Sequence, residues 1–203
     1  MKKVKIYGLA VLALFAFVLP VQAQTLHYGI KVGPDFAVQS GIGEYFSNGD
    51  MRVGVHAGLA GSYNLSKHMM LVTEFDYDQA GSHSSQVTER YDYLSVPVLF
   101  DYSFGKTDRE GMTMHLNIGP YISYLVNAKK VEDVNGTSTT TGIYSGANQG
   151  ELGAMLGVGL IQPVGKHQVT MDVRLNLGLT PYIPSGGEND HNKSIGIYLG
   201  YML

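Results

Sequence analysis

Apolar residues recur at every second position in segment after segment of this chain, starting near residue 28. A period of two is typical of β-strands, whose successive side chains point to opposite faces of a sheet. Each segment approaches the roughly 9 to 11 residues that a tilted strand needs to cross a bilayer. The pattern therefore predicts an all-β protein with eight strands, whose apolar positions fall within residues 28–38, 53–59, 69–77, 94–104, 116–126, 152–160, 169–179 and 195–203.

The connections between these segments alternate in length. Tight connections are expected at 64–68, 105–111 and 163–166, and longer polar ones at 40–50, 81–88, 129–149 and 181–192. Short turns at one rim and long loops at the other are typical of outer-membrane barrels. We therefore expect an eight-stranded antiparallel up-and-down transmembrane β-barrel. Both chain ends should lie on its short-turn side, and the 129–149 segment should be an exposed, mobile loop.

Alternation alone fits both a membrane barrel, which is apolar outside, and a soluble lipocalin-like barrel, which is apolar inside. The apolar face carries no charge in the eight segments, whereas the opposite face combines glycine with scattered charges. An eight-stranded barrel has an interior just wide enough for side chains, so small residues must alternate there with large polar ones. This favours a membrane barrel with a filled polar lumen, and the soluble barrel remains the alternative.

Charged side chains on the inward face must be paired, because an isolated ion in a low-dielectric interior costs several kcal/mol. We expect a structural ion network in the lumen. Its cations are Lys31, Arg52 and Arg174, and its carboxylates are Asp35, Glu74, Asp76, Asp101, Glu151 and Asp172.

The first residues have the order of a secretory signal peptide. Lys2, Lys3 and Lys5 precede an uncharged apolar run over residues 6–19, and a small-residue cleavage site ends at Ala23. The run is shorter than the roughly 20 residues of a spanning helix, which disfavours an N-terminal anchor. We expect a signal peptide at 1–23 and one barrel domain at 24–203.

Composition narrows the class of protein further. Removing the three leader lysines lowers the number of Lys and Arg residues from 14 to 11 against 17 Asp and Glu, a net charge of −6, so a nucleic-acid partner is not expected. Charged residues make up only 15% of the chain, against roughly a quarter in soluble proteins. There is no cysteine, which excludes disulfides and thiol chemistry.

Candidate chemistry is sparse. The seven histidines form no His-Glu-x-x-His motif, and contacts in the lumen or at a rim explain them more simply than a metal centre. Glu74, Asp76 and Asp78 share the inward face, and a hydrolase could use such a group beside a histidine. A buried ion network is the simpler interpretation, because basic residues share that face. We expect no catalytic residue, cofactor or metal.

Several segments resemble the outer-membrane protein β-barrel domain family of Bacteroidetes, called PorT-like. They lie at residues 29–34, 93–98, 118–121, 175–179 and 195–201, so the resemblance covers nearly all of the chain after the leader. It implies a barrel in the outer membrane of a Gram-negative bacterium, and it implies no activity. The expected partners are outer-membrane lipid and the barrel insertion machinery. That machinery often reads a terminal aromatic residue, where this sequence has Met202-Leu203.

The leading hypothesis is a non-enzymatic outer-membrane barrel with a plugged polar lumen. It would present the 129–149 loop and its neighbours for a structural, adhesion or recognition role, toward an extracellular ligand that the sequence does not identify. A narrow porin-like channel for ions or small solutes is the alternative. An outer-leaflet enzyme is the third hypothesis.

Overall fold

The computed structural model describes residues 26–40, 51–83, 87–104, 111–134, 137–142, 148–181 and 191–203. The expected leader at 1–23 lies outside these residues. No helix in the described part of the chain is long and apolar enough to cross a membrane. The described strands are β1 (Leu26–Ser40), β2 (Arg52–Asn64), β3 (Met69–His83), β4 (Val87–Phe104), β5 (Thr113–Val134), β6 (Thr137–Gly142), β7 (Gly150–Val164), β8 (His167–Gly178) and β9 (His191–Met202).

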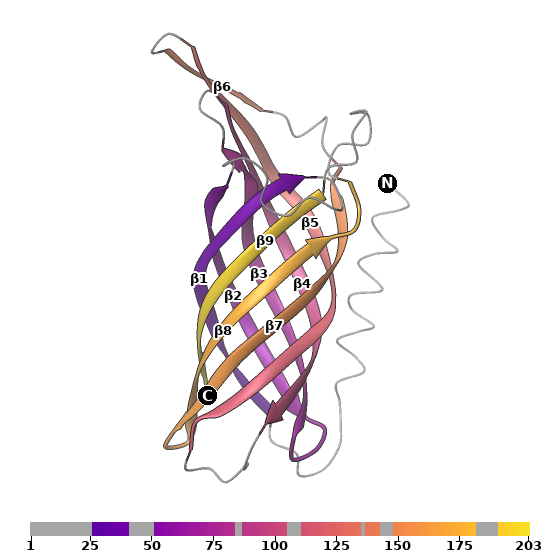
Figure 1. The fold of residues 1–203 in the computed structure, drawn as a ribbon, viewed down its shortest axis with the longest axis vertical. Coiled ribbons are helices and arrows are strands. Elements are labelled where there is room, and N and C mark those ends of the chain that lie inside the picture. Colours follow the sequence, from indigo (N-terminus) through magenta and orange to yellow (C-terminus); the bar gives the residue numbers. More distant parts are fainter. Residues whose placement is uncertain are drawn as a thin grey trace.

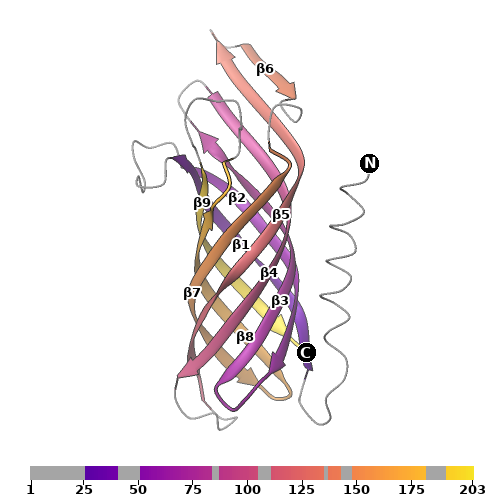
Figure 2. The same cartoon turned by 90° about the vertical axis from the view of Figure 1, so that its right-hand side faces the viewer.

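Eight of these strands close into a barrel. From β1 to β5 each strand pairs antiparallel with the next, β5 pairs with β7, and β7, β8 and β9 follow in order until β9 pairs with β1. The strands tilt around a common axis (Figures 1 and 2). Closure removes the open edges that lipid cannot hydrogen-bond. The predicted eight-stranded antiparallel barrel is therefore confirmed, and β6 is an addition outside its wall.

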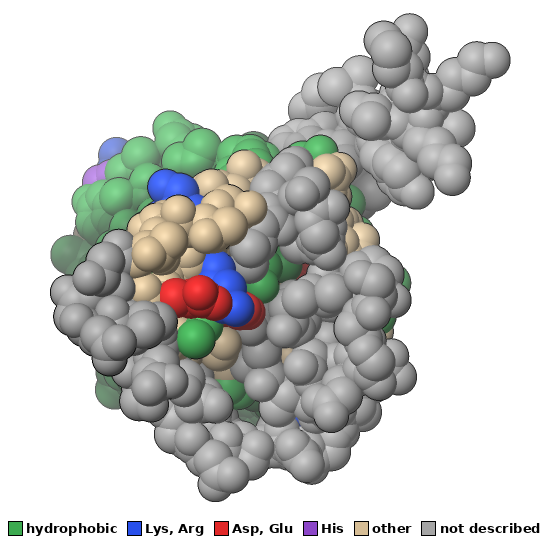
Figure 3. Space-filling model, turned by 90° about the horizontal axis from the view of Figure 1, so that it is seen from above, with side chains coloured by type: hydrophobic (Ala, Val, Ile, Leu, Met, Phe, Trp, Pro, Cys, Tyr) green, Lys and Arg blue, Asp and Glu red, His purple; other side chains and the backbone are tan. Residues whose placement is uncertain are grey.

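The alternating apolar residues face outward, as predicted. A soluble protein rarely exposes a continuous apolar surface of this extent, so the wall is suited to lipid. In the view from the β6 end, hydrophobic side chains cover much of the visible outer wall (Figure 3). Exposed residues come from every barrel strand, and examples in chain order are Tyr28, Leu59, Phe75, Phe100, Ile118, Leu156, Val173 and Leu199.

One outward position was predicted wrongly. Val38 was expected on the outer face, but it is buried together with Ala37. In the described residues, the pairing of β1 with β2 ends at Ala37, while the pairing with β9 continues to Ser40. Strict alternation of faces therefore ends where β1 leaves one of its two neighbours.

The tight turns and the chain end lie together at one rim. Residues 65–68 and 165–166 make two of the predicted short turns, and Gly165 has the positive φ of 63° that favours glycine. At the same rim Leu203 N donates a hydrogen bond of 2.7 Å to Tyr28 O. The described residues thus begin and end on the short-turn side (Figure 1).

Two of the predicted loops are largely strand. Pairing of β3 with β4 continues as far as His83 and Thr88, so most of the expected 81–88 loop belongs to the sheet. Residues 129–134 of β5 pair with 137–142 of β6, so the expected mobile 129–149 loop is for the most part a β-hairpin. The segment was misread because it is polar on both faces and lacks apolar periodicity, although its threonines favour strands.

Glycines make room for the large side chains in the lumen. A Cβ added to Gly157 would lie 2.7 Å from Arg174 Cγ, and one added to Gly153 would lie 2.2 Å from the Tyr121 ring. In each pair the glycine stands directly opposite the large residue on the neighbouring strand. The abundant inward glycines therefore fit the narrow interior that eight strands enclose.

Candidate functional site

Four charged side chains from three strands meet inside the barrel. Arg174 on β8 donates from Nη1 to Glu74 Oε2 at 2.6 Å and from Nη2 to Glu74 Oε1 at 3.0 Å. Lys31 Nζ on β1 lies 2.9 Å from Glu74 Oε1 and 2.9 Å from Asp172 Oδ2. Arg174 Nη2 also lies 3.9 Å from Asp172 Oδ1. Lys31, Glu74, Asp172 and Arg174 are called the ion cluster below.

The ion cluster crosses the whole width of the lumen. Strands β3 and β8 are separated by β2, β1 and β9, so they stand on opposite sides of an eight-stranded ring. All four residues are at most 5% exposed. A guanidinium stays protonated in a protein, so the two carboxylates must compensate the two cations where they are buried.

His115 and Asn117 extend the cluster to the remaining side of the wall. His115 Nδ1 on β5 bonds to Asp101 on β4, and its Nε2 lies 3.2 Å from Asp172 Oδ1. Asn117 Nδ2 donates to the same Asp172 oxygen at 3.2 Å. Through His115, Asn117 and Asp101, the polar network around the ion cluster includes side chains from β1, β3, β4, β5 and β8.

Three of the expected network residues lie elsewhere. Asp35 accepts a hydrogen bond of 2.8 Å from Tyr198 Oη, and Glu151 accepts one of 2.7 Å from Tyr121 Oη. Arg52 is half-buried and donates to Ala80 O at 3.2 Å; among the described residues no carboxylate lies within 4.0 Å of it. These positions lie toward the long-loop ends of β1, β7 and β2, beyond the reach of the ion cluster. The structure therefore corrects the expectation that Asp35, Glu151 and Arg52 form ion pairs within this cluster.

Asp76 also lies on the inward face, but among the described residues it has no Lys or Arg nitrogen within 4.0 Å and no hydrogen-bond donor. Both of its carboxylate oxygens are buried without a hydrogen-bond partner. His56 Nε2 lies 3.8 Å from Asp76 Oδ1. The other ring nitrogen, Nδ1, lies 2.6 Å from Asp78 Oδ1. One ligand atom each from His56, Glu74 and Asp76 can be chosen so that all three lie within 4.8 Å of one another.

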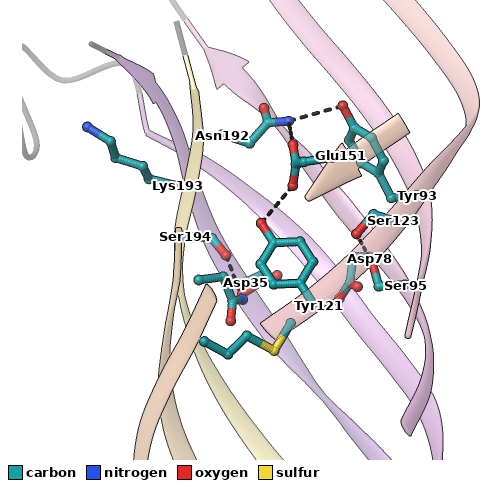
Figure 4. A pocket seen from close by; sticks show the side chains of 13 residues that line it. Asp35, Asp78, Tyr93, Ser95, Tyr121, Ser123, Glu151, Asn192, Lys193 and Ser194 are labelled. Atoms are coloured by element: carbon teal, nitrogen blue, oxygen red, sulfur yellow. Dashed lines mark hydrogen bonds between the residues drawn. The ribbon is translucent and has the colours of Figure 1, made fainter. Parts of the chain in front are cut away.

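A small cavity lies between the ion cluster and the long-loop rim. It has a volume of about 40 Å³, space for a few water molecules. Figure 4 shows Asp35, Asp78 and Glu151 among its lining residues. Glu151 holds a hydrogen-bonded chain across it, since Asn192 Nδ2 donates to Glu151 and, at 3.0 Å, also contacts Tyr93 Oη.

The neutral side chains that contact the charged residues of the lumen were not predicted from the sequence. His56 and Asn176 stand on the inward face by the same alternation as the charged residues, but nothing in the sequence pairs them with a partner. Tyr198 links several of these groups, because it stacks on His56 at 4.0 Å and accepts a hydrogen bond from Asn176 Nδ2 at 3.2 Å. Gly196 and Gly200 stand two residues before and two residues after Tyr198. They are the only signal in the sequence that a large inward side chain is accommodated there.

A closed antiparallel barrel of eight strands with an apolar outer wall and an ion-paired lumen defines the outer-membrane class of β-barrel proteins. The chain belongs to the outer membrane protein beta-barrel domain family, whose family model matches residues 22–183. The comparison with curated proteins gives no significant match.

Solved structures with the same architecture come from several bacteria. Neisserial surface protein A is 11% identical, with a TM-score of 0.55 over 88% of this chain and 98% of that one. The attachment invasion locus protein Ail of Yersinia pestis is 13% identical, with a TM-score of 0.45 over 87% of this chain and 98% of that one. The N-terminal β-barrel domain of Pseudomonas aeruginosa OprF is 14% identical, with a TM-score of 0.45 over 90% and 100%. At such identities the likeness to the neisserial protein shows the fold alone.

Proposed function

We propose that the protein is a non-enzymatic outer-membrane barrel of a Gram-negative bacterium, closed to solutes, which presents the β5–β6 hairpin outside the cell for recognition or adhesion. The observation that carries this proposal is the ion cluster. Its Arg174–Glu74 pair joins opposite walls of the barrel at 2.6 and 3.0 Å. The sequence resemblance given above favours Bacteroidetes as the source, with outer-membrane lipid and the insertion machinery as partners.

Closure follows from where the charged groups lie. A water-filled pore exposes its lining side chains to solvent, as in the larger porin barrels. Here Glu74, Asp172 and Arg174 are at most 3% exposed, and their contacts are made with one another. Opening a path would require breaking charge pairs that are already desolvated, which costs several kcal/mol.

The hairpin supports a role at the surface. Residues 129–134 of β5 pair with β6 on one side and, through residues 129–132, with β4 on the other. This three-stranded sheet continues past the barrel mouth, with β6 at its far end (Figure 1). In the described part of the chain β6 pairs only with β5, and Thr139, Thr140 and Thr141 are exposed. An exposed edge strand offers unpaired backbone groups to an extended segment of a partner.

The positions of the buried histidines favour a non-enzymatic role. An outer-leaflet enzyme has to bring its acid or base to a lipid substrate. His56 and His115, the two histidines paired with carboxylates inside this barrel, are 2% and 3% exposed. Both are enclosed by the wall and so are kept away from the lipid.

Conductance in planar lipid bilayers tests the proposal. The wild-type protein should give no steady current. A variant that removes the transverse pair, Glu74→Ala with Arg174→Ala, should give discrete current steps. A matched variant outside the barrel, Lys130→Ala with Glu132→Ala, removes an exposed ion pair of 2.8 Å and should remain silent. Steady ohmic steps from the wild-type protein would contradict closure.

The same recording tests the alternative of a narrow channel. The cavity near the long-loop rim favours that alternative, because Asp35, Asp78 and Glu151 line it and would attract cations. A cation-selective current in the wild-type protein, reduced when Glu151 is replaced by Gln, would establish the channel in place of the closed barrel.

A further inference from the structure

We propose that the lumen contains a binding site for one divalent transition-metal ion of the Zn²⁺ class. Its ligands are His56 on β2 with Asp76 and Glu74 on β3, and Asp78 holds His56 in the binding orientation. The proposal goes beyond the surface role and the closed lumen proposed above, and the site shares one residue, Glu74, with the ion cluster. The two strands are neighbours, and their register places His56 directly opposite Asp78.

The hydrogen bond at Nδ1 sets the chemistry of the other ring nitrogen. His56 Nδ1 lies 2.6 Å from Asp78 Oδ1, where an N–H donating to the carboxylate is favourable. A neutral imidazole with its proton on Nδ1 has a lone pair on Nε2. The carboxylate–histidine pair is the arrangement that usually orients a metal-binding histidine and raises its basicity. Asp78 therefore prepares Nε2 to bind a cation.

The Nε2 lone pair faces a carboxylate that also lacks a partner. Among the described residues, neither His56 Nε2 nor either oxygen of Asp76 has a hydrogen bond, and both side chains are at least 98% buried. Nε2 and Asp76 Oδ1 are 3.8 Å apart. Two acceptors that face each other in a desolvated interior repel unless a positive species lies between them.

The separations fit a bridging metal ion better than direct contact. Zinc binds imidazole nitrogen and carboxylate oxygen at about 2.0 to 2.2 Å, so two ligands on one ion lie about 3 to 4 Å apart. The 3.8 Å separation of His56 Nε2 and Asp76 Oδ1 falls in that range. An atom of Glu74 lies within 4.8 Å of both and would move closer to them on binding the same ion. One imidazole with two carboxylates is a ligand set for zinc or a neighbouring transition metal, whereas calcium and magnesium prefer oxygen alone.

The local charges leave room for a dication. Lys31 and Arg174 are paired with Glu74 and Asp172. Among the described residues, Asp76 and Asp78 have no Lys or Arg nitrogen within 4.0 Å, and His56 is the group within that distance that can carry a positive charge. Arg174 and Lys31 act on Asp76 from farther away. A divalent ion at Nε2 would compensate both carboxylates, whereas a proton on His56 would compensate one.

The cavity reaches the proposed metal site at Asp78. Asp78 lines the cavity near the long-loop rim (Figure 4), and its side chain is 15% exposed, against 1% for Asp76. Asp78 is thus the outer group of the proposed metal site, and His56 Nε2 and Asp76 are its inner groups. An ion would pass Asp78 from the cavity before it reached its ligands.

Metal binding to the folded protein tests the site directly. The protein is folded into detergent micelles with a chelator present, exchanged into ZnCl₂ solution, and passed over a desalting column. Elemental analysis should then find one zinc per chain in the wild type and less than a tenth of that in His56→Asn and Asp76→Asn. Histidine 83 provides the matched control, because it is an exposed residue on β3 bonded to Thr88. His83→Asn should retain one zinc.

Two further readouts separate ligands from merely structural residues. Zinc should raise the urea midpoint of the wild type in proportion to its concentration, since a ligand that binds only the folded state stabilises it, and should leave Asp76→Asn unchanged. Asp78→Asn should weaken zinc binding by about 10 to 100-fold and keep one site at saturation, as expected for a residue that orients a ligand. Circular dichroism confirms that each variant is folded before it is compared.

Three results would overturn the proposal. One is a folded wild-type protein that retains less than a tenth of an equivalent of zinc. Another is equal zinc in wild type, His56→Asn and Asp76→Asn, which would place the metal elsewhere. The third is loss of zinc in His83→Asn alone. If Asp76→Asn does not fold, His56→Asn and the X-ray absorption spectrum of the zinc-loaded wild type decide, since an imidazole ligand gives a characteristic scattering pattern.

Discussion

Arg174 and Glu74 face each other from opposite sides of the barrel and form a two-point ion pair, with nitrogen–oxygen distances of 2.6 and 3.0 Å. The strands that carry them are four positions apart in the closed sheet. Few side chains other than arginine combine the length to reach across an eight-stranded barrel with a planar fork that matches a carboxylate. The pair therefore couples two walls that share no backbone hydrogen bond, and it is the basis of the proposed closure.

Removing the arginine should destabilise the barrel strongly. We predict that Arg174→Met lowers the free energy of unfolding by about 3 to 5 kcal/mol, because Glu74 is left with only Lys31 in a buried site. Arg52→Met makes the same chemical change at a half-buried position without a carboxylate partner among the described residues, and should cost less than half as much. Urea titration in detergent micelles gives both values. Equal losses of unfolding free energy would mean that the Arg174–Glu74 pair contributes no more to stability than Arg52 does.

Crowding the lumen at a glycine should also be costly. A Cβ on Gly153 would approach the Tyr121 ring to 2.2 Å, whereas a Cβ on Gly150, at the start of the same strand, would meet nothing within 4 Å. Gly153→Ala should therefore cost about 1 to 3 kcal/mol, as over-packed cores do, and Gly150→Ala should be close to neutral. Thermal unfolding of the two variants side by side measures the difference. A neutral Gly153→Ala would show that Tyr121 is not held against that backbone.

Charge on the outer face should be tolerated only near a rim. Leu156 and Val173 are exposed in the middle of β7 and β8, so Leu156→Arg and Val173→Arg place a charge in the hydrocarbon and should cost about 2 to 4 kcal/mol. Val164 is exposed beside the 165–166 turn, and Val164→Arg should cost about 0 to 1 kcal/mol. Equilibrium unfolding from lipid vesicles compares the three. Unchanged stability of both mid-strand variants would reverse the assignment of the faces.

The proposed orientation can be tested with single cysteines, since the chain has none of its own. Thr140→Cys lies on the hairpin and Lys67→Cys on a tight turn at the opposite rim, and both positions are exposed. A membrane-impermeant maleimide should label Thr140→Cys on intact cells. It should label Lys67→Cys only after the outer membrane is opened. The reverse pattern would place the hairpin in the periplasm.

The strands and their closure could be predicted from sequence because one property, lipid on one face and a crowded lumen on the other, repeats at every second residue. Val38 shows where that argument ends, since its strand has lost one neighbour there. The hairpin of residues 129–134 and 137–142 was missed because its sequence is polar at successive positions, so that no alternation marks it as strand.

The inward face of the charged residues was predictable, but their partners were not. Lys31 and Asp35 share a face of β1, yet four residues of strand separate them by about 13 Å, so they lie at different heights in the barrel. The height of a side chain along the axis of a tilted barrel depends on the register of all the strands, which a single sequence does not specify. The same limit hid the pairing of His56 with Asp78, residues that only the register of β2 with β3 brings together.

Two neighbouring residues of β9 give the sharpest test of a lipid-facing wall around a lumen that is proposed to be closed. The chain contains no tryptophan, so Ile197→Trp and Tyr198→Trp each carry a single indole, one at an exposed position and one at a position 1% exposed. In vesicles, lipids brominated on their acyl chains should quench Ile197→Trp strongly and Tyr198→Trp weakly, and aqueous acrylamide should quench neither. Strong acrylamide quenching of a folded Tyr198→Trp would show a water-filled lumen, and bromolipid quenching of Tyr198→Trp in place of Ile197→Trp would show that the faces are reversed.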